Sequence, residues 1–255
     1  MSLKHVTSHD NPDYKGVLAL ADDARARRQS GQTLLDGEHL IEEALNAGIQ
    51  PLRLILESGN EIALRWHARL TTVPVLELAP GLFRKLSPVA SPSGVLAVIT
   101  TPHPGTACGD FVLLLEAIQD PGNLGAILRT AAATGVTDVL LSPGCAEAWS
   151  PKALRGGQGG QFRLRVHPGV DLASWLDTWS GAALAAMPNV PGLLYDLDLS
   201  GPVAFAFGNE GAGLSPALQA RCRTFAIPMA GDVESLNVAA SVAVCLYERL
   251  RQGLK

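Results

Sequence analysis

The chain has 255 residues, of which 47% are hydrophobic and 17% charged, a composition typical of a folded protein and not of a disordered one. The formal net charge of -4 excludes a uniformly basic nucleic-acid-binding surface and leaves only local basic patches. The four cysteines are widely spaced and lack a CxxC pair, which disfavours a zinc site and a disulfide framework. Because no signal peptide and no membrane-spanning run are recognisable, we expect a cytoplasmic protein without a membrane partner.

The first half of the chain has the pattern of a small α/β domain. Residues 1–15 are polar and are expected to form a flexible arm, followed by a helix that begins near Val17. Strands are expected at TLLDG, LRLILES, VPVLEL and GVLAVIT, and helices at EHLIEEALNAG, EIALRWHARL and GLFRKL. This alternation predicts a domain over residues 16–100.

A second α/β domain is expected over residues 111–255, after a linker at 101–110 that is rich in Pro and Gly. FVLLLEAI, TDVLLSP, AALAAM, VAFAF and TFAIPM are expected to be strands, with helices at NLGAILRTAAATG, SPKALRGG, DLASWLDTW and SPALQARC. A final helix follows, apolar on nearly every side. Continuous apolar strands separated by helices predict a mostly parallel sheet, which binds ligands at the carboxyl ends of its strands.

Three segments of the second half carry polar residues directly after predicted strands. In QDPGNLGAILRTA, Asn123 is expected to cap a helix and Gly125 to allow close backbone approach. Arg129 then falls among apolar helix positions, where an arginine is more often paired or ligand-facing than solvated.

The second segment is FAFGNEGAGLS, a glycine-rich turn that contains Asn209 and Glu210. Its glycine spacing does not match G-x-G-x-x-G, which disfavours a nicotinamide-dependent enzyme. The third segment is IPMAGDVESLNVAAS, with a turn predicted at residues 230–232 and with Ser235 and Asn237 in the first turn of the final helix. The simplest interpretation of these two residues alone is a helix cap.

Together the three segments resemble the signature motifs of the SpoU/TrmH branch of the SPOUT family of RNA ribose 2′-O-methyltransferases. The matching residues are N-x-G-x-x-x-R at Asn123 to Arg129, F-G-N-E-G-x-G-L-S at Phe207 to Ser215, and I-P-M…S-L-N-V from Ile227 to Val238. The first half is similar to that family's small substrate-binding domain, which has the ribosomal protein L30e fold.

The resemblance implies a knotted C-terminal domain that binds S-adenosylmethionine, acts as a homodimer through that domain and needs no metal. A trefoil knot of this kind is a rare exception to the rule that chains do not thread. The cofactor-binding positions that it implies are Met187, Gly208, Asn209, Gly211, Ile227, Met229 and Leu236.

The catalytic set that we predict is Asn123, Arg129, Glu210, Ser235 and Asn237. Methyl transfer to a ribose hydroxyl is an in-line displacement, so positioning supplies most of the rate increase. The family's proposed general base is the arginine of the first motif. A guanidinium scarcely deprotonates in proteins, so we expect Arg129 to orient the hydroxyl and lower its pKa together with an RNA phosphate.

Local basic clusters are the expected RNA contacts, with Arg25, Arg27, Arg28 and Arg155 as the candidates. Arg65 and Arg69 are interpreted as members of a solvated helix face. The sequence therefore predicts an S-adenosylmethionine-dependent 2′-O-methyltransferase of ribosomal RNA. Transfer RNA as the substrate and a non-catalytic RNA-binding protein that retains the fold are the alternatives.

Overall fold

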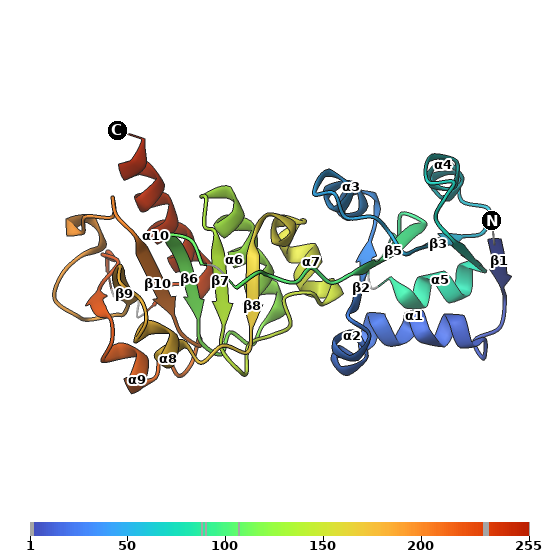
Figure 1. Ribbon diagram of the computed structural model, residues 1–255. Coiled ribbons are helices and arrows are strands. Elements are labelled where there is room, and N and C mark those ends of the chain that lie inside the picture. The colour runs from blue at the N-terminus through green and yellow to red at the C-terminus, as the bar shows by residue number, and fades with distance from the viewer. Residues whose placement is uncertain (1–2, 88, 90, 107, 232–234, 255) are drawn as a thin grey trace. The chain divides into compact units, whose positions relative to one another are not determined.

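The structure is a computed structural model that describes residues 3–87, 89, 91–106, 108–231 and 235–254 (Figure 1). Its internal contacts divide the chain into two compact units. The N-terminal unit comprises Met1–Pro102 and Trp149–Phe162, and the C-terminal unit comprises His103–Ala148 and Arg163–Lys255. Within the described ranges, no helix is long and apolar enough to cross a membrane.

The N-terminal unit alternates strands and helices, as the sequence predicts. Its elements are β1 (Leu3–Val6), α1 (Pro12–Asp22), α2 (Ala24–Ser30), β2 (Gln32–Asp36), α3 (Glu38–Asn46), β3 (Arg53–Glu57), α4 (Glu61–Arg69), β4 (Val75–Leu78), α5 (Pro80–Leu86) and β5 (Val95–Thr100). The described strands form one sheet in the order β1-β4-β3-β5-β2, in which β5 runs antiparallel to both neighbours. Helices α1 and α5 cover one face, and α3 and α4 cover the other (Figure 1).

The predicted flexible arm over residues 1–15 is wrong for the part of it that the structure describes. Strand β1 pairs in parallel with β4, and the side chain of Tyr14 is only 1% exposed. Helix α1 begins at Pro12, where Asn11 accepts a hydrogen bond from the backbone of Asp13. A four-residue edge strand is too short to show a sequence period, which explains why it was not predicted.

A segment from the second half of the sequence packs on the N-terminal sheet. Helix α7 (Pro151–Gly157) contacts strand β2, and Thr33 donates a hydrogen bond from Oγ1 to the carbonyl of Trp149 over 2.5 Å. The short 3₁₀ helix η1 (Gly160–Arg163) follows α7. The sequence placed all of residues 111–255 in one domain, but the contacts of residues 149–162 group them with the N-terminal unit.

The described part of the C-terminal unit is built on a parallel sheet, which confirms the prediction. Its strands are β6 (Phe111–Leu115), β7 (Asp138–Leu141), β8 (Arg165–Pro168), β9 (Ala182–Ala186), β10 (Val203–Phe207) and β11 (Arg223–Phe225), in the order β11-β9-β10-β6-β7-β8. Strands β7 and β8, which follow β6 in the sequence, lie on one side of β6, and β10, β9 and β11 lie on its other side. The strand order therefore reverses between β6 and β10, the position at which parallel sheets bind ligands.

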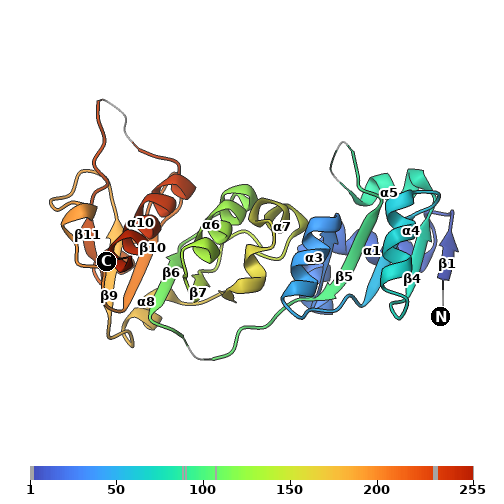
Figure 2. The same cartoon turned by 90° about the horizontal axis from the view of Figure 1, so that it is seen from above.

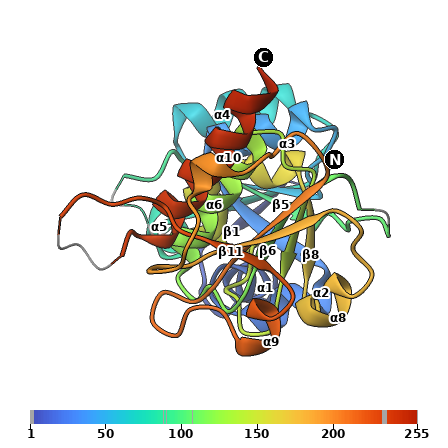
Figure 3. The same cartoon turned by 90° about the vertical axis from the view of Figure 1, so that its left-hand side faces the viewer.

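The helices of this unit lie on both faces of the sheet. They are α6 (Pro121–Ala133), α8 (Leu172–Leu176), the 3₁₀ helix η2 (Leu194–Asp196), α9 (Pro216–Gln219) and α10 (Val238–Gly253). Helices α6 and α10 pack side by side on one face (Figure 2). Figure 3 shows α8 and α9 near one another at one end of the unit, and the two helices are in contact.

The final helix differs from its prediction in two respects. Its cap is Asn237, whose Oδ1 accepts hydrogen bonds from the backbone of Ala239 and Ala240, and Ser235 precedes the helix. The helix is also buried along one face only, since Tyr247 is 52% exposed and Ala240 and Arg251 are exposed as well. The turn predicted at residues 230–232 includes Asp232, which lies outside the described residues.

Candidate functional site

The start of α6 carries a polar side chain that is free to bind outside the helix. The N-cap is Asp120, whose Oδ1 accepts a hydrogen bond from the backbone of Asn123 over 2.8 Å. The prediction that Asn123 is the cap is therefore wrong, and the signal for the correct cap is the Asp-Pro pair that precedes the helix. Because Asp120 performs the capping, the carboxamide of Asn123 is available for other partners.

Asn123 joins two segments that are distant in the sequence. Its Nδ2 donates to Oε1 of Glu210 over 2.8 Å, and its Oδ1 accepts from Nδ2 of Asn237 over 3.1 Å. The Oδ1 of Asn237 already accepts from the backbone of α10, so its Nδ2 must be the atom that faces Asn123. The side-chain amides of Asn237 and Asn123 therefore each have one orientation that satisfies all of these hydrogen bonds. The three side chains form a polar cluster of Glu210, Asn123 and Asn237, and its two end members are exposed to solvent.

The glycine-rich turn after β10 is held closed by its own backbone. Asn209 and Gly213 exchange two backbone hydrogen bonds, and Oδ1 of Asn209 accepts from the backbone of Gly211 and Ala212. The Nδ2 of Asn209 donates to the carbonyl of Ala117, two residues after the end of β6. A Cβ atom on Gly208 would lie 2.2 Å from the carbonyl carbon of Gly213, so this position requires glycine. Asn209 is thus primarily a structural residue that fixes the turn beside β6.

A cavity of about 610 Å³ lies between this turn and the segment that leads into α10. Its volume falls in the range of ordinary ligand pockets. Every cofactor-binding position predicted from the sequence lines it: Met187, Gly208, Asn209, Gly211, Ile227, Met229 and Leu236. The polar residues Glu210, Ser235 and Asn237 line it too, so the cavity and the polar cluster share a wall.

The chemistry of this cavity suits S-adenosylmethionine better than a dinucleotide. Among the described residues that line it, Glu210 is the only charged side chain, and none is cationic. A pyrophosphate would find no positive charge there, whereas a sulfonium cation lies beside a carboxylate. Methionine, isoleucine and leucine side chains offer the apolar contact that an adenine ring needs.

Arg129 is not brought into the polar cluster. It lies on α6 with an exposed side chain, and it lines neither this cavity nor the larger one described below. Within the described part of the chain, its guanidinium has no hydrogen bond and no ion pair. All of its donors are therefore available to a ligand that approaches from solvent.

The predicted RNA-binding arginines divide into two groups. Arg25 and Arg28 are exposed on α2. Arg27 is only 6% exposed, and its Nη1 donates to the carbonyls of Leu20 and Ala21 at the end of α1. The prediction that Arg27 contacts RNA is therefore wrong, because the side chain is used to satisfy carbonyls that the helix end leaves unpaired.

Arg155 is held by a buried carboxylate that sequence reasoning missed. Its Nη1 lies 3.4 Å from Oδ2 of Asp36, and the side chain of Asp36 is only 5% exposed. Burial raises the pKa of Asp36, although the hydroxyl of Ser87 and the charge of Arg155 oppose this. About a third of the Arg155 side chain remains exposed, which leaves donors free for a phosphate.

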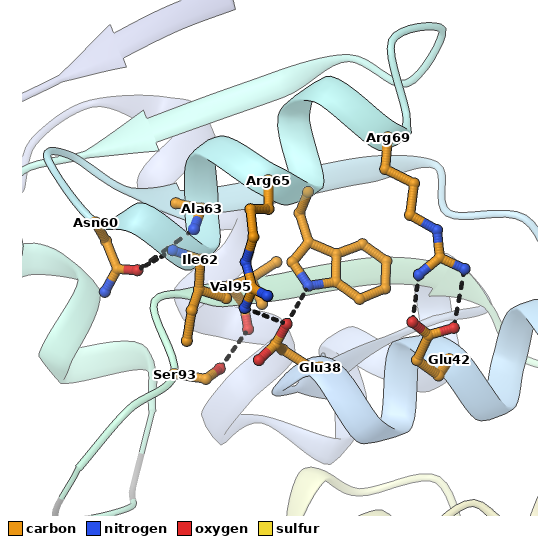
Figure 4. Close-up of polar contacts among 10 residues, drawn as sticks. Glu38, Glu42, Asn60, Ile62, Ala63, Arg65, Arg69, Ser93 and Val95 are labelled. Carbon is orange, nitrogen blue, oxygen red and sulfur yellow. Dashed lines mark hydrogen bonds and ion pairs between the residues drawn. The ribbon is translucent and has the colours of Figure 1, made fainter.

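The face of the N-terminal unit formed by α3 and α4 carries paired charges (Figure 4). Arg65 pairs with Glu38, and Arg69 pairs through two nitrogens with Glu42. Exposed pairs of this kind contribute little to stability and leave little free charge. The structure thus agrees with the interpretation of Arg65 and Arg69 as surface residues of a solvated face.

One further group of described residues has the composition of a metal site. Ligand atoms of Cys108, Asp138 and His167 lie within 4.8 Å of one another. Both carboxylate oxygens of Asp138 accept from the guanidinium of Arg165, at 2.8 Å and 2.6 Å. The positive charge of Arg165, held against this carboxylate, opposes the binding of a metal cation, so we interpret the three residues as a structural group.

Comparison with models of protein families gives two matches. Residues 110–247 match the SpoU rRNA Methylase family, and residues 11–97 match the MRM3-like substrate binding domain. The first match covers more than half of the chain and includes the cavity, the glycine-rich turn and the polar cluster.

Two bacterial relatives are similar to this chain over nearly their whole length. A Synechocystis protein described as an uncharacterized tRNA/rRNA methyltransferase is 37% identical over 97% of this chain and 93% of its own. The 23S rRNA (guanosine(2553)-2′-O)-methyltransferase RlmP of Bacillus subtilis is 32% identical over 96% of this chain and 98% of its own.

Solved structures give the same result. An RNA 2′-O ribose methyltransferase superposes with a TM-score of 0.84 at 32% identity, covering 98% of this chain and 100% of its own. The SpoU methyltransferase AviRb from Streptomyces viridochromogenes, in complex with AdoMet, superposes with a TM-score of 0.84 at 26% identity, covering 96% and 99%.

Proposed function

The chain belongs to the SpoU rRNA methylase family, and from that premise we propose how its residues divide the work of the reaction. It is an S-adenosylmethionine-dependent methyltransferase that modifies a ribose 2′-hydroxyl of ribosomal RNA. The observation that carries the assignment of residues is the shared wall between the 610 Å³ cavity and the polar cluster. It brings a cofactor pocket within reach of side chains that can hold a hydroxyl.

The cofactor is assigned to that cavity. Met187, Ile227 and Leu236 would hold its apolar parts, and the backbone of the glycine-rich turn would lie against it where Gly208 permits close approach. S-adenosylmethionine, when bound, supplies an electrophilic methyl group on a sulfonium. The carboxylate of Glu210 is the one charge in the described lining that favours this cation.

The ribose is assigned to the polar cluster. Asn123 and Asn237 are fixed by each other and by the cap of α10, so their amide groups are oriented before RNA binds. Preorganised hydrogen-bonding groups hold a hydroxyl in line with a methyl group without loss of entropy at the moment of reaction. Ser235, exposed on the wall of the cavity, adds a hydroxyl that can donate or accept beside them.

Arg129 is assigned to the RNA phosphate next to the modified ribose. Its exposed guanidinium has all donors free among the described residues, which suits a bidentate phosphate contact. A positive charge near the 2′-hydroxyl also lowers the pKa of that hydroxyl and assists loss of its proton. This role does not require the arginine itself to deprotonate.

The N-terminal unit is assigned to RNA recognition, in agreement with its match to a substrate-binding domain. Arg25 and Arg28 are exposed on α2, and Arg155 is held by Asp36 with part of its guanidinium open to solvent. These contacts are expected to bind phosphates and to give little sequence preference.

A homodimer is proposed through the C-terminal unit. Helix α10 buries one face against α6, yet Tyr247 on that helix and Leu254 directly after it remain exposed, as do Leu193 and Tyr195 at η2. Exposed large apolar side chains on neighbouring elements are typical of an interface. Analytical ultracentrifugation tests the dimer, and loss of association in Tyr247→Asp is the expected result.

We place the protein in the cytoplasm, where ribosomal RNA is modified.

The central test combines binding and product mapping. Titration calorimetry is expected to show that the protein binds S-adenosylmethionine, and mass spectrometry is expected to find one 2′-O-methylated nucleotide in ribosomal RNA only when the protein is present. If the protein bound RNA but did not bind S-adenosylmethionine, and no methylated nucleotide were found, it would be a non-catalytic member of the family. Methylation of transfer RNA alone would change the substrate but not the reaction.

A further inference from the structure

The C-terminal unit contains a second and larger cavity, of about 850 Å³, that no step of the proposed reaction uses. It opens at the carboxyl ends of β6 and β7 and reaches the loop before α8 and the start of α9. Leu214 and Leu218 supply apolar walls, while Glu116, Ser142 and Asp171 supply polar ones. This mixture of an apolar wall and a few polar groups is typical of a small-ligand site.

This cavity adjoins the methyl-transfer site. Asn209, Ala212, Gly213 and Leu214 line both cavities, so the glycine-rich turn forms the partition between them. Gln119, which lines the larger cavity, directly precedes the Asp120 cap that leads to Asn123. The cavity also lies where the strand order reverses, between the ends of β6 and β10, which is the ligand position of parallel sheets.

The lining excludes a phosphate and favours a neutral ring with hydrogen-bond donors. Among the described residues that line the cavity, none is cationic, and two are carboxylates. Glu116 Oε2 accepts from the backbone of Ser215 over 2.7 Å, and Asp171 accepts from the backbone and hydroxyl of Ser174. A carboxylate has about four lone-pair positions, so both retain acceptor capacity toward the cavity.

We propose that this cavity receives the base of the nucleotide whose ribose is methylated, and that the base carries an exocyclic amino group. The inference rests on the proposed function, since it needs the ribose at the Asn123 cluster. A base turned out of its stack is held between apolar side chains and hydrogen-bonded along its Watson–Crick edge. The carboxylates of Glu116 and Asp171 accept from the amino donors of guanine, adenine or cytosine.

The test fills the cavity from an exposed position. Ala217 lies on α9, is exposed and lines the cavity, whereas Ala220 is exposed directly after the same helix and does not line it. Ala217→Phe is expected to lower kcat/KM at least tenfold toward an unmodified large-subunit rRNA transcript, and Ala220→Phe to change it less than twofold. Both variants are expected to bind S-adenosylmethionine with the affinity of the unaltered protein, because neither residue lines the cofactor cavity.

A second variant removes charge without filling space. Asp171→Ser keeps a side-chain oxygen that can cap α8 but removes the carboxylate. It is expected to lower kcat/KM toward the transcript severalfold with unchanged cofactor affinity. Unaltered kcat/KM in both Ala217→Phe and Asp171→Ser would overturn the inference while leaving the proposed function intact.

The substrate provides an independent measurement once the methylated position is mapped. A transcript with an abasic nucleotide at that position is expected to lose as much kcat/KM with the unaltered protein as Ala217→Phe loses with the normal transcript. With that abasic transcript, Ala217→Phe is expected to cause little further loss. Methylation of the abasic transcript at the normal rate, or a uridine at the mapped position, would overturn the inference. Absence of methyl transfer to every RNA by the unaltered protein would instead overturn the proposed function.

Discussion

Asn237 donates a hydrogen bond to Asn123 over 3.1 Å, across 114 positions of the sequence. The same carboxamide caps α10 with its oxygen, so one side chain both begins the last helix and orients the polar cluster. The carboxamide of Asn237 therefore belongs both to the helix cap and to the candidate active site. The two roles can be separated by substitution.

Asn237→Ser is expected to retain the cap and lose the contact with Asn123. Serine is an effective N-cap but is too short to reach the partner amide. We expect a reduction in kcat of about tenfold or more, with little change in the melting temperature. Asn237→Ala removes both the cap and the contact, so it is expected to lower the free energy of unfolding by about 1 kcal/mol in addition. Equal kcat for Asn237→Ser and the unaltered protein would remove Asn237 from the site.

Gly208→Ala is expected to weaken cofactor binding. The added Cβ would lie 2.2 Å from the backbone of Gly213, so the turn that lines the cofactor cavity has to open. We expect the Kd for S-adenosylmethionine to rise at least tenfold in calorimetry, a change of about 1.4 kcal/mol. Gly201→Ala is the matched control, because a Cβ there meets nothing within 4 Å. An unchanged Kd for Gly208→Ala would place the cofactor elsewhere.

Arg129→Lys tests the phosphate contact. Lysine keeps the charge but loses the planar pair of donors, so we expect weaker positioning of RNA and a kcat/KM reduced by about tenfold or more. Cofactor affinity is expected to stay unchanged, since Arg129 does not line the cavity. Near-normal turnover of Arg129→Lys at saturating RNA would contradict this role and the general-base role together.

RNA affinity is expected to depend on Arg25 and Arg28 and on salt. Each phosphate contact releases a counterion, so Arg25→Ala or Arg28→Ala is expected to reduce the slope of log K against log salt by about 1. Arg65→Ala is the control, because Arg65 is already paired with Glu38. A flat salt response of the unaltered protein would count against RNA binding through phosphates.

Asp138 is expected to make the C-terminal unit sensitive to acid. Burial alone raises the pKa of this carboxyl, but hydrogen bonds from Arg165, the backbone of Gly109 and His167 outweigh it and hold the pKa well below its ordinary value. A depressed folded-state pKa contributes stability above the ordinary pKa, and this is lost as the pH falls below about 4. Asp138→Asn is expected to cost roughly 3 kcal/mol at neutral pH and to flatten that acid dependence in chemical denaturation.

Several features of the site follow from local sequence. The continuous apolar runs of β6 and β10 predict buried parallel strands, and the polar residues after each strand then fall at the same edge of the sheet. The glycine at position 208 and the cofactor-binding positions were identified through motif resemblance. All of these positions line one cavity. The trefoil threading implied by the same resemblance stays a prediction.

Other features depend on contacts that no local pattern reports. Arg25, Arg27 and Arg28 look alike in sequence, but only the packing of α2 against α1 turns Arg27 inward to the carbonyls of Leu20 and Ala21. The partnership of Asp36 with Arg155 joins residues 119 positions apart. Strand β1 is stable only because β4 provides its hydrogen-bond partners.

The sequence by itself determined the alternation of elements, the parallel C-terminal sheet and the family, because hydrophobic period and motif residues are local properties. Tertiary structure alone decided that Asn123, whose side chain the local cap at Asp120 leaves free, meets Glu210 and Asn237. It also decided that Arg129 stands apart from that cluster. The physical reason is that the hydrogen-bond partner of a side chain depends on which donors and acceptors the fold brings within reach, and these come from segments that are distant in the sequence.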